Sequence, residues 1–454
     1  MPSFAGRFQI TNPDGTGGLA AACSASFDAE RMALAPAAGA PLAFDLGDID
    51  EFHPADYELT LKLYTGQEVL LGQFGKAFQN LCHDLLAAWR DRVVRCLLLE
   101  DLEELARLEG FADLDSAERR LAQPVEVRLY RSNLAILPES ATGFHWRLAD
   151  IDAVHFDAKD YALTIRSGTD RLSISKLARR TDEFRDRLHD AMTVLSQQSA
   201  AVVQKLFPFL SPDELQRVTE VLKEGRSVPL SALTGVHRRI EQALTENAID
   251  AELRPYFDGL KEQSTADGIF TGFRLIRREA EPGGNGAEPP EAAGEAGAAD
   301  SPLEPPGVEA PVEDGKSGDV LHWFFFPLGA VNAAGARASV IAWEATSRSG
   351  RATYCFRMPP AEEISRSQDA SRDPFRVDAA VHRLNRGIAL LNFHREPIYL
   401  PDDSLELQPR FRRYAIAARK IPVLRELRNQ FLGRAIHTTP EAWRKQLQAL
   451  LAKA

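Results

Sequence analysis

An alternation of apolar and polar residues occurs twice along the chain, about a hundred residues apart. Residues 58–71 read "ELTLKLYTGQEVLL" and residues 162–175 read "ALTIRSGTDRLSIS", so nearly every second position is apolar in both. A period of two places the apolar side chains on one face of a strand. Gly66 and Gly168 lie between the alternating stretches and supply the positive φ that a tight turn needs. Each segment therefore predicts a β-hairpin with one buried face.

After each hairpin the apolar spacing changes to that of a helix. Residues 76–99 place Phe78, Leu81, Cys82, Leu85, Leu86 and Trp89 on one helical stripe. Residues 180–195 do the same with Phe184, Leu188, Ala191, Met192 and Leu195, and Thr181 is a candidate N-cap. Each hairpin is therefore expected to lead into an amphipathic helix.

The agreement between the two regions extends over their whole length. Residues from Ser26 align with residues from Arg128 at a constant offset, so that Asp48-Ile49-Asp50 meets Asp150-Ile151-Asp152. After a short insertion Tyr57 meets Tyr161, and a further shift matches Phe78 and His83-Asp84 with Phe184 and His189-Asp190. Apolar positions that agree in this way, with few identical residues, indicate one fold used twice.

About seven short strands followed by one helix carrying an aromatic residue such as Trp89 make up each unit. This order resembles the pleckstrin-homology-like fold over roughly residues 5–100 and 122–197. In that family a bent antiparallel barrel is capped at one open end by its C-terminal helix. The resemblance implies an α+β fold class, with tandem antiparallel barrels each closed by a C-terminal helix and separated by helical spacers.

A third copy is predicted further along the chain. "LHWFFFPLGAV" (321–331) matches "FHWRLADIDAV" (144–154), a hairpin follows around Ser349-Gly350, and residues 374–393 read as a closing helix. In both His-Trp pairs the Trp is expected to point inward and the His outward. Residues 281–317 consist mostly of Gly, Pro, Ala and acidic residues, a composition that predicts a disordered insertion inside this copy. A linker between two domains is the alternative.

These patterns divide the chain into five predicted parts. They are a first repeat with an extended closing helix (1–112), a second repeat (122–200), a helical spacer (201–266), a third repeat interrupted at 281–317 (267–396), and a basic helical segment (397–454). A capping box at Ser211 and Glu214 begins one spacer helix, and Thr438 with Glu441 is expected to cap the last helix.

Composition narrows the function classes. The formal charge of −11 argues against a protein that coats nucleic acid with its whole surface. The chain shows no signal-peptide pattern and no apolar run of membrane-spanning length, so a cytoplasmic location is expected. The four cysteines are scattered, which indicates reduced thiols rather than a disulfide framework or a zinc site.

Candidate catalytic groups are weak. His83-Asp84 and His189-Asp190 are neighbours on helices, so their side chains diverge by about 100° and do not face each other. Asp48 with Asp50, and Asp150 with Asp152, could hold a divalent cation, but solvated strand or turn residues are the favoured interpretation. No serine-hydrolase, P-loop or metalloprotease motif occurs. We therefore expect no catalytic, cofactor-binding or metal-binding residues, and no enzymatic activity.

Two basic regions are candidate binding sites for a partner or an anion. The first surrounds the second hairpin and comprises Arg166, Arg171, Lys176, Arg179 and Arg180; the second lies in the C-terminal segment and comprises Arg410, Arg412, Arg413, Arg419 and Lys420. The C-terminal residues either bind an anionic partner or form a helical lid. In the second case their positive charges pair with acidic residues in the rest of the protein.

The sequence thus predicts a non-catalytic interaction or scaffold protein. A protein partner, held in a groove between barrel and helix or on a strand edge, is the favoured ligand. The alternative is a binder of anionic surfaces, phospholipid or nucleic acid, through the two basic regions.

Overall fold

The computed structural model describes residues 3–100, 102–116, 119–168, 170–264, 268–275, 320–331, 337–346, 351–358 and 376–453. The chain forms two compact units. Unit 1 comprises residues 1–227 and 356–431, and unit 2 comprises residues 228–355 and 432–454.

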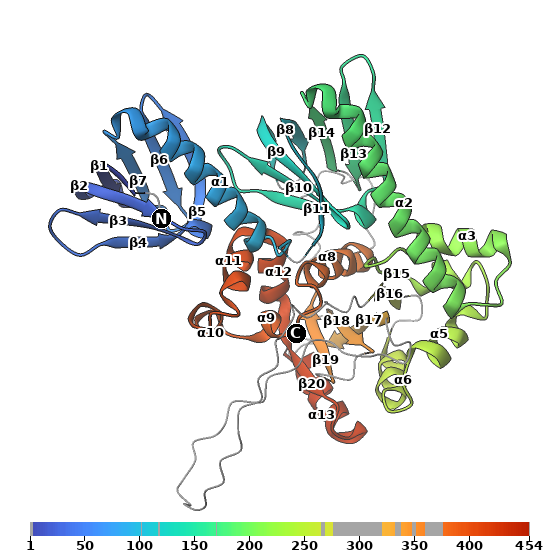
Figure 1. Cartoon of the computed structure of the whole chain (residues 1–454). Helices are drawn as coiled ribbons and strands as arrows, with labels where there is room; N and C mark the ends of the chain where they lie inside the picture. Colours follow the sequence, from blue (N-terminus) through green and yellow to red (C-terminus); the bar gives the residue numbers. More distant parts are fainter. Residues whose placement is uncertain are drawn as a thin grey trace, which may run out of the picture. The chain divides into compact units, whose positions relative to one another are not determined.

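The first part of unit 1 is a curled antiparallel sheet of seven strands (Figure 1). Its strands are β1 (Ser3–Thr11), β2 (Gly17–Phe27), β3 (Arg31–Pro36), β4 (Leu42–Asp45), β5 (Ile49–Ala55), β6 (Glu58–Leu63) and β7 (Glu68–Gly72). They are arranged in the order β4-β3-β2-β1-β7-β6-β5, so the first strand pairs with both the second and the seventh. The expected hairpin of residues 58–71 is β6 and β7.

A second seven-stranded sheet repeats this arrangement. Its strands are β8 (Glu104–Asp115), β9 (Arg120–Tyr130), β10 (Asn133–Pro138), β11 (Phe144–Arg147), β12 (Ala153–Asp157), β13 (Ala162–Ser167) and β14 (Asp170–Ser175). The order β11-β10-β9-β8-β14-β13-β12 is that of the first sheet, strand for strand. The α+β class and the two seven-stranded antiparallel sheets predicted from the sequence are therefore confirmed.

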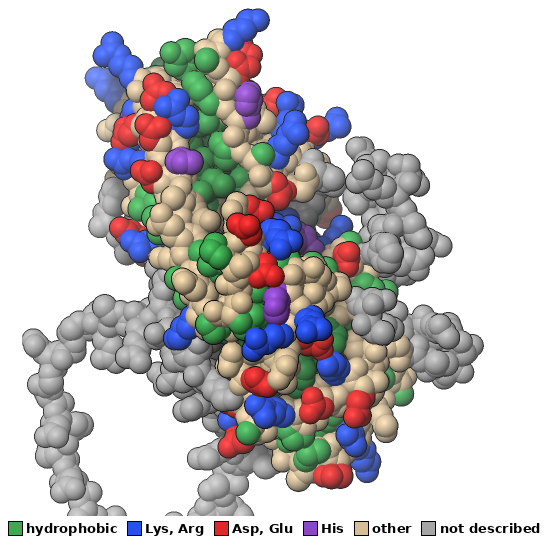
Figure 2. Space-filling model, turned by 90° about the vertical axis from the view of Figure 1, so that its right-hand side faces the viewer, with side chains coloured by type: hydrophobic (Ala, Val, Ile, Leu, Met, Phe, Trp, Pro, Cys, Tyr) green, Lys and Arg blue, Asp and Glu red, His purple; other side chains and the backbone are tan. Residues whose placement is uncertain are grey.

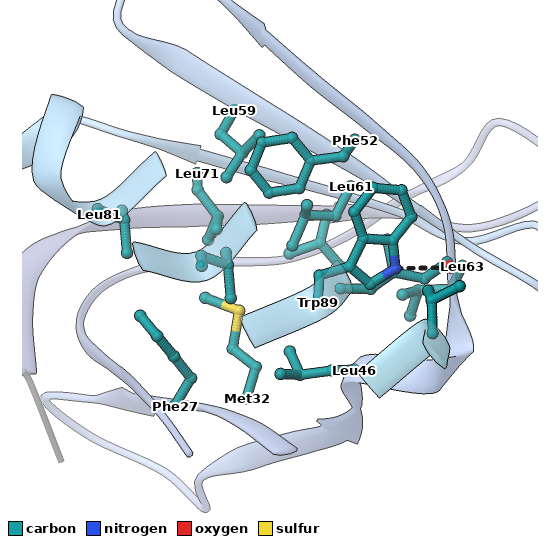
Figure 3. Packing of buried hydrophobic residues seen from close by; sticks show 14 of the residues in the cluster. Phe27, Met32, Leu46, Phe52, Leu59, Leu61, Leu63, Leu71, Leu81 and Trp89 are labelled. Atoms are coloured by element: carbon teal, nitrogen blue, oxygen red, sulfur yellow. Dashed lines mark hydrogen bonds between the residues drawn. The ribbon is translucent and has the colours of Figure 1, made fainter. Parts of the chain in front are cut away.

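Each sheet is followed by a long helix, α1 (Phe78–Cys96) or α2 (Thr181–Leu206). Helix α1 packs Leu81, Leu85 and Trp89 into the core of the first sheet (Figure 3). Helix α2 packs Phe184, Leu188 and Leu195 into the core of the second sheet. These apolar contacts follow the helical stripes seen in the sequence, so burial rather than helix propensity positions the two helices.

The structure corrects how the two helices correspond. Each follows a single 3₁₀ turn that the chain enters through two residues with positive φ, Gln73 and Gly75 before α1 and Lys176 and Ala178 before α2. Aligning these turns pairs Trp89 with Met192, so the alignment of Phe78 with Phe184 is wrong by about one helical turn. An apolar stripe spaced by three and four residues nearly matches itself after a shift of about three positions, which explains the error.

The boundary between the two repeats also differs from the prediction. The first closing helix was expected to extend to residue 112, but α1 ends at Cys96 and residues 104–115 form β8 in the second sheet. The segment "ELARLEGF" contains strong helix formers, but its burial pattern alternates. It forms a strand because it pairs with β9 along its length.

The last part of unit 1 is helical. It contains α8 (Arg376–Leu390), α9 (Glu396–Tyr399), α10 (Asp402–Leu407), α11 (Arg412–Lys420) and α12 (Pro422–Gln430), in addition to α3 (Pro212–Val221) after the second repeat. The predicted capping box at the start of α3 is confirmed, because the Ser211 hydroxyl accepts a hydrogen bond from the Glu214 amide and the Glu214 carboxylate accepts one from the Ser211 amide.

Unit 2 is built around a six-stranded sheet. Its elements are β15 (Val228–Pro229), α4 (Leu230–Thr234), α5 (Ile240–Ala248), α6 (Arg254–Gln263), β16 (Phe270–Leu275), β17 (Val320–Val331), β18 (Arg337–Ala345), β19 (Ala352–Arg357), β20 (Phe431–Ile436) and α13 (Pro440–Leu451). Phe257 of α6 packs edge-on against Phe324 and Phe326 of β17. Thr439, rather than the expected Thr438, caps α13, and residues 431–436 are a strand where a helix was expected.

The six-stranded sheet does not repeat the strand order of the first two. Its strands follow one another in sequence, from β15 to β20. Helix α8, which was expected to close a third copy, belongs to unit 1. The prediction of a third repeat at residues 267–396 therefore rests on sequence similarity alone. The insertion predicted at residues 281–317 lies outside the described residues.

The two His-Trp pairs have both side chains buried. Trp146 and Trp323 lie in the core as expected, but His145 and His322 are also buried, at 8% and 2% exposure. Neighbouring residues of a strand point to opposite faces, so the histidines are buried on the face of the sheet away from the tryptophans. Burial lowers the pKa of His145 to about 3 and that of His322 to about 4, because the charged imidazolium loses its hydration.

Candidate functional site

A groove in the second repeat is the candidate site. It lies between β12 and α2 and has a volume of about 740 Å³, within the usual range of ligand pockets. Val154, Phe156 and Leu163 line it from the sheet, and Leu188, Met192 and Leu195 line it from the helix. Figure 2 shows a band of hydrophobic side chains on the side of the molecule where β12 and α2 lie, flanked by charged residues. The groove is therefore an apolar depression with a polar rim.

One wall of the groove is a sheet edge. β12 is the last strand of its sheet and pairs with β13 along one side only. An edge strand presents backbone N–H and C=O groups that can pair with another extended chain. Among the described residues, no side-chain donor reaches the carbonyl oxygens of Ile151 and Asp152, directly before β12.

The corresponding place in the first repeat is filled. Trp89 stacks on Phe52 with their ring centroids 5.7 Å apart, and its indole N–H donates to the Ile49 carbonyl oxygen at 3.2 Å (Figure 3). By strand register Phe52, opposite Leu61, corresponds to Val154, opposite Ile165. By the 3₁₀ alignment Trp89 corresponds to Met192. Two aromatic side chains are thus replaced by smaller ones, and both replacements line the groove.

The chain also covers the edge of β5 in the first repeat. The Ile49 carbonyl accepts a second bond, from the Lys420 ammonium of α11 at 2.7 Å, and the Asp50 carbonyl accepts one from the Thr142 hydroxyl at 3.3 Å. Ile49 and Asp50 are the counterparts of Ile151 and Asp152. Of these two counterparts, Asp152 is exposed and lines the groove, whereas Ile151 is only 1% exposed.

The rim of the groove carries more acidic than basic side chains. Its ionisable groups are Asp152, Asp186, Asp190 and Glu224 against Arg185 and Lys223, with His189 also present. Arg185 pairs with Asp186 at 3.0 Å, and Arg226, just beyond the rim, lies 3.7 Å from Asp152. This rim favours a neutral or basic ligand over an acidic one.

The predicted basic cluster of the second hairpin is split between the two ends of β14. Arg166 and Arg171 lie directly opposite each other at the turn end, and both are exposed. Lys176, Arg179 and Arg180 follow β14 at its other end, about 17 Å along the strand from Arg171. Lys176 lies over the Phe111 ring and Arg180 bonds the Arg107 carbonyl. The structure thus brings together only Arg166 and Arg171.

The basic residues of the C-terminal segment lie mostly against carboxylates of the same unit. Arg419 pairs with Asp48 at 2.9 Å and with Glu406, and Lys420 pairs with Asp50 at 3.2 Å. Arg413 pairs with Glu100, and Arg412 lies 3.6 Å from Asp45. Arg410 lies over the Phe411 ring. Their role in binding an anion stays a prediction, and any such ligand would have to compete with these contacts.

The two Asp-Ile-Asp motifs hold basic side chains. Asp48 and Asp50 hold Arg419 and Lys420 of α11, and Asp150 forms an ion pair with Arg147 at 3.1 Å. Nearby Arg147, His382 and Arg386 keep the pKa of the Asp150 carboxyl below its usual value despite burial. Among the described residues, no group of three or more His, Cys, Asp and Glu side chains is placed to hold a metal ion.

The sequence matches no protein-family model and no curated protein, so the groove stands on its own geometry. Within the described part of the chain, no helix is long and apolar enough to cross a membrane. Sequence analysis expected a groove between barrel and helix and placed Met192, Leu188 and Leu195 on the buried stripe of α2, but it did not locate the groove in the second repeat. The available signal was the loss of a tryptophan between the repeats, which the shifted helix alignment concealed.

Proposed function

We propose that this chain is a non-catalytic interaction protein built on tandem pleckstrin-homology-like units. Support comes from the two sheets with one strand order, each followed by a helix that packs into the sheet's core. Such likeness of fold does not by itself define a ligand, so the function must rest on the site.

The second repeat binds a segment of a protein partner in the groove between β12 and α2. The observation that carries this proposal is an apolar pocket of about 740 Å³ beside an edge strand. An extended peptide gains affinity by pairing with such an edge and gains specificity by placing alternate side chains in the adjoining pocket. The first repeat, whose equivalent space is filled, has a structural role.

A comparison of two baits tests this function. The full-length protein and its V154F/M192W variant, which introduces the aromatic residues of the first repeat, are used to capture proteins from native lysate at low and high salt. We expect a stoichiometric protein that binds the wild type, resists high salt and is lost with the variant. Capture that is equal for both baits would refute binding in the groove.

The runner-up function is binding of an anionic surface, and one observation favours it. Arg166 and Arg171 face each other across the hairpin, both exposed, which leaves two like charges to be neutralised. Binding to vesicles containing phosphatidylserine, or to single-stranded RNA, should then fall steeply with salt and be lost in R166E/R171E. Unchanged binding in that variant would exclude the hairpin.

A further inference from the structure

In the first repeat, a side chain of the protein itself occupies the space that corresponds to the groove of the second repeat. In the first repeat the space between α1 and the sheet edge is occupied by the Trp89 indole, which contacts Phe52 and bonds a backbone carbonyl. Trp89 is only 1% exposed, and it lies among Phe52, Leu61 and Leu63 in Figure 3. The indole thus combines a large apolar surface with one donor, and the site satisfies both.

The second repeat has apolar residues equivalent to those around Trp89, but it has no tryptophan at the equivalent position. Leu148 and Ile165 stand where the first repeat has Leu46 and Leu61, and both are buried. Val154, by contrast, is 36% exposed where Phe52 is 1% exposed. Ile151, the counterpart of Ile49, is only 1% exposed and does not line the groove, so the comparison concerns the space of the ring rather than its hydrogen bond. A cavity with an apolar lining therefore remains where the first repeat has its indole.

We propose that the groove recognises a tryptophan side chain of the partner. The partner segment pairs with the edge of β12 in extended conformation and inserts the indole between Val154 and Met192, which both line the groove. This inference rests on the proposed function, and it specifies the chemistry of the anchor residue.

The charges at the rim of the groove indicate which residues flank the tryptophan in the partner. Asp152, Asp186, Asp190 and Glu224 outnumber Arg185 and Lys223 around the groove. Like charges placed together at an interface are unfavourable, whereas opposite charges at the rim speed association. Lysine or arginine next to the tryptophan is therefore favoured, and aspartate or glutamate there weakens binding.

Selection of peptides tests both levels of the proposal. Random peptides displayed on phage are selected on the immobilised full-length protein and counter-selected on V154F/M192W. We expect groove-dependent peptides that share a tryptophan flanked by basic residues. Groove-dependent peptides without a tryptophan would overturn the anchor and leave the peptide-binding function intact. Recovery of no groove-dependent peptide would overturn both.

Variants of a selected peptide then show how much the tryptophan contributes to the binding affinity. In fluorescence polarisation with the full-length protein, replacing its tryptophan with alanine should weaken binding on the order of 30-fold, as for a central hot-spot residue. Replacing it with phenylalanine, which keeps an aromatic ring but fills less of the cavity, should weaken binding about 3- to 10-fold. Equal affinity for the tryptophan and alanine peptides would overturn the anchor.

Indole alone provides an independent readout. Saturation-transfer NMR with free indole should give a signal with the wild type and none with M192W, whose own indole fills the cavity. Circular dichroism establishes that each variant folds, and the single M192W replacement serves if V154F/M192W does not. The surface variant R171Q is the matched control and should bind indole as the wild type does. An indole signal equal in wild type and M192W would overturn the proposal.

Discussion

The two repeats of unit 1 share one strand order and differ in what occupies the space beside their last strand. In the first repeat Trp89 and Phe52 fill that space and Lys420 binds the carbonyl at its end. In the second repeat Met192 and Val154 leave a groove. The same framework is thus filled by aromatic side chains in one copy and leaves an open groove in the other.

The largest expected effect comes from removing the tryptophan that fills the first repeat. W89A should lower the free energy of unfolding by about 3–5 kcal/mol, because it leaves a cavity in a close-packed core. The matched change M192A should cost about 1 kcal/mol, since Met192 is already partly exposed in the groove. Hydrogen exchange of the amide groups in each sheet measures the two losses separately. Similar losses in both sheets would contradict the difference between the repeats.

The second effect concerns helix α11, which contacts the first repeat through Arg419 and Lys420. The Lys420 side chain is only 3% exposed, and R419E/K420E would place two carboxylates beside Asp48 and Asp50. Breaking such partly buried pairs should cost about 2–4 kcal/mol and make residues 400–431 sensitive to protease. Thermal melting and limited proteolysis measure this.

The control for that experiment is the exposed hairpin of the second repeat. R166E/R171E should change stability by no more than about 0.5 kcal/mol. If R419E/K420E also leaves stability unchanged but abolishes binding of an anionic ligand, the C-terminal residues form a binding site rather than a lid.

Sequence patterns predicted the parts of the fold that rest on local periodicity. The two hairpins, the stripes of α1 and α2 and the capping box at Ser211 all follow from spacing along the chain. The strand β8 was missed because helix formers in residues 104–111 compete with pairing to β9, a contact that local pattern does not reveal.

A groove between barrel and helix was expected, but its location in the second repeat could not be predicted because it depends on pairs of residues from separate elements. Met192 has the spacing of a core residue, and only its position opposite Val154 leaves space. The sequence placed Asp48 and Asp50 on the surface, but their partners, Arg419 and Lys420, lie more than three hundred positions later in the chain. Such contacts are set by tertiary packing and carry no periodic signal.

A third effect is a dependence of stability on pH that we expect for the second sheet and not for the first. His145 in the second sheet corresponds to Ala43 in the first, and the folded-state pKa of His145 is about 3 because of burial and the nearby Arg386 and Arg147. The unfolded chain therefore takes up a proton below pH about 6.5, while the folded chain does not. Stability should fall as pH drops from about 6.5 towards 3, with a slope of about 1.4 kcal/mol per unit.

Denaturant unfolding of the wild type and H145A at pH 7 and pH 5 measures this term. The stability advantage of the wild type over H145A should shrink by about 2 kcal/mol at the lower pH. A constant difference between the two proteins would show that His145 is protonated in the folded state as easily as in the unfolded state.

The smallest effect lies in the hairpins, where an acidic residue of the first repeat is replaced by a basic residue in the second. In the first repeat Lys62 stands opposite Glu68, whereas in the second Arg166 stands opposite Arg171. R166E should therefore stabilise the second repeat by about 0.2–1 kcal/mol at low salt, and K62E should destabilise the first by a similar amount, because like charges directly opposite repel. Both effects on stability should be smaller at 1 M salt, because charges at these positions are then almost fully screened. Melting temperatures at the two salt concentrations measure them. A loss of stability in R166E would mean that the arginine pair is already neutralised by other groups, which would remove the argument for an anion at this hairpin.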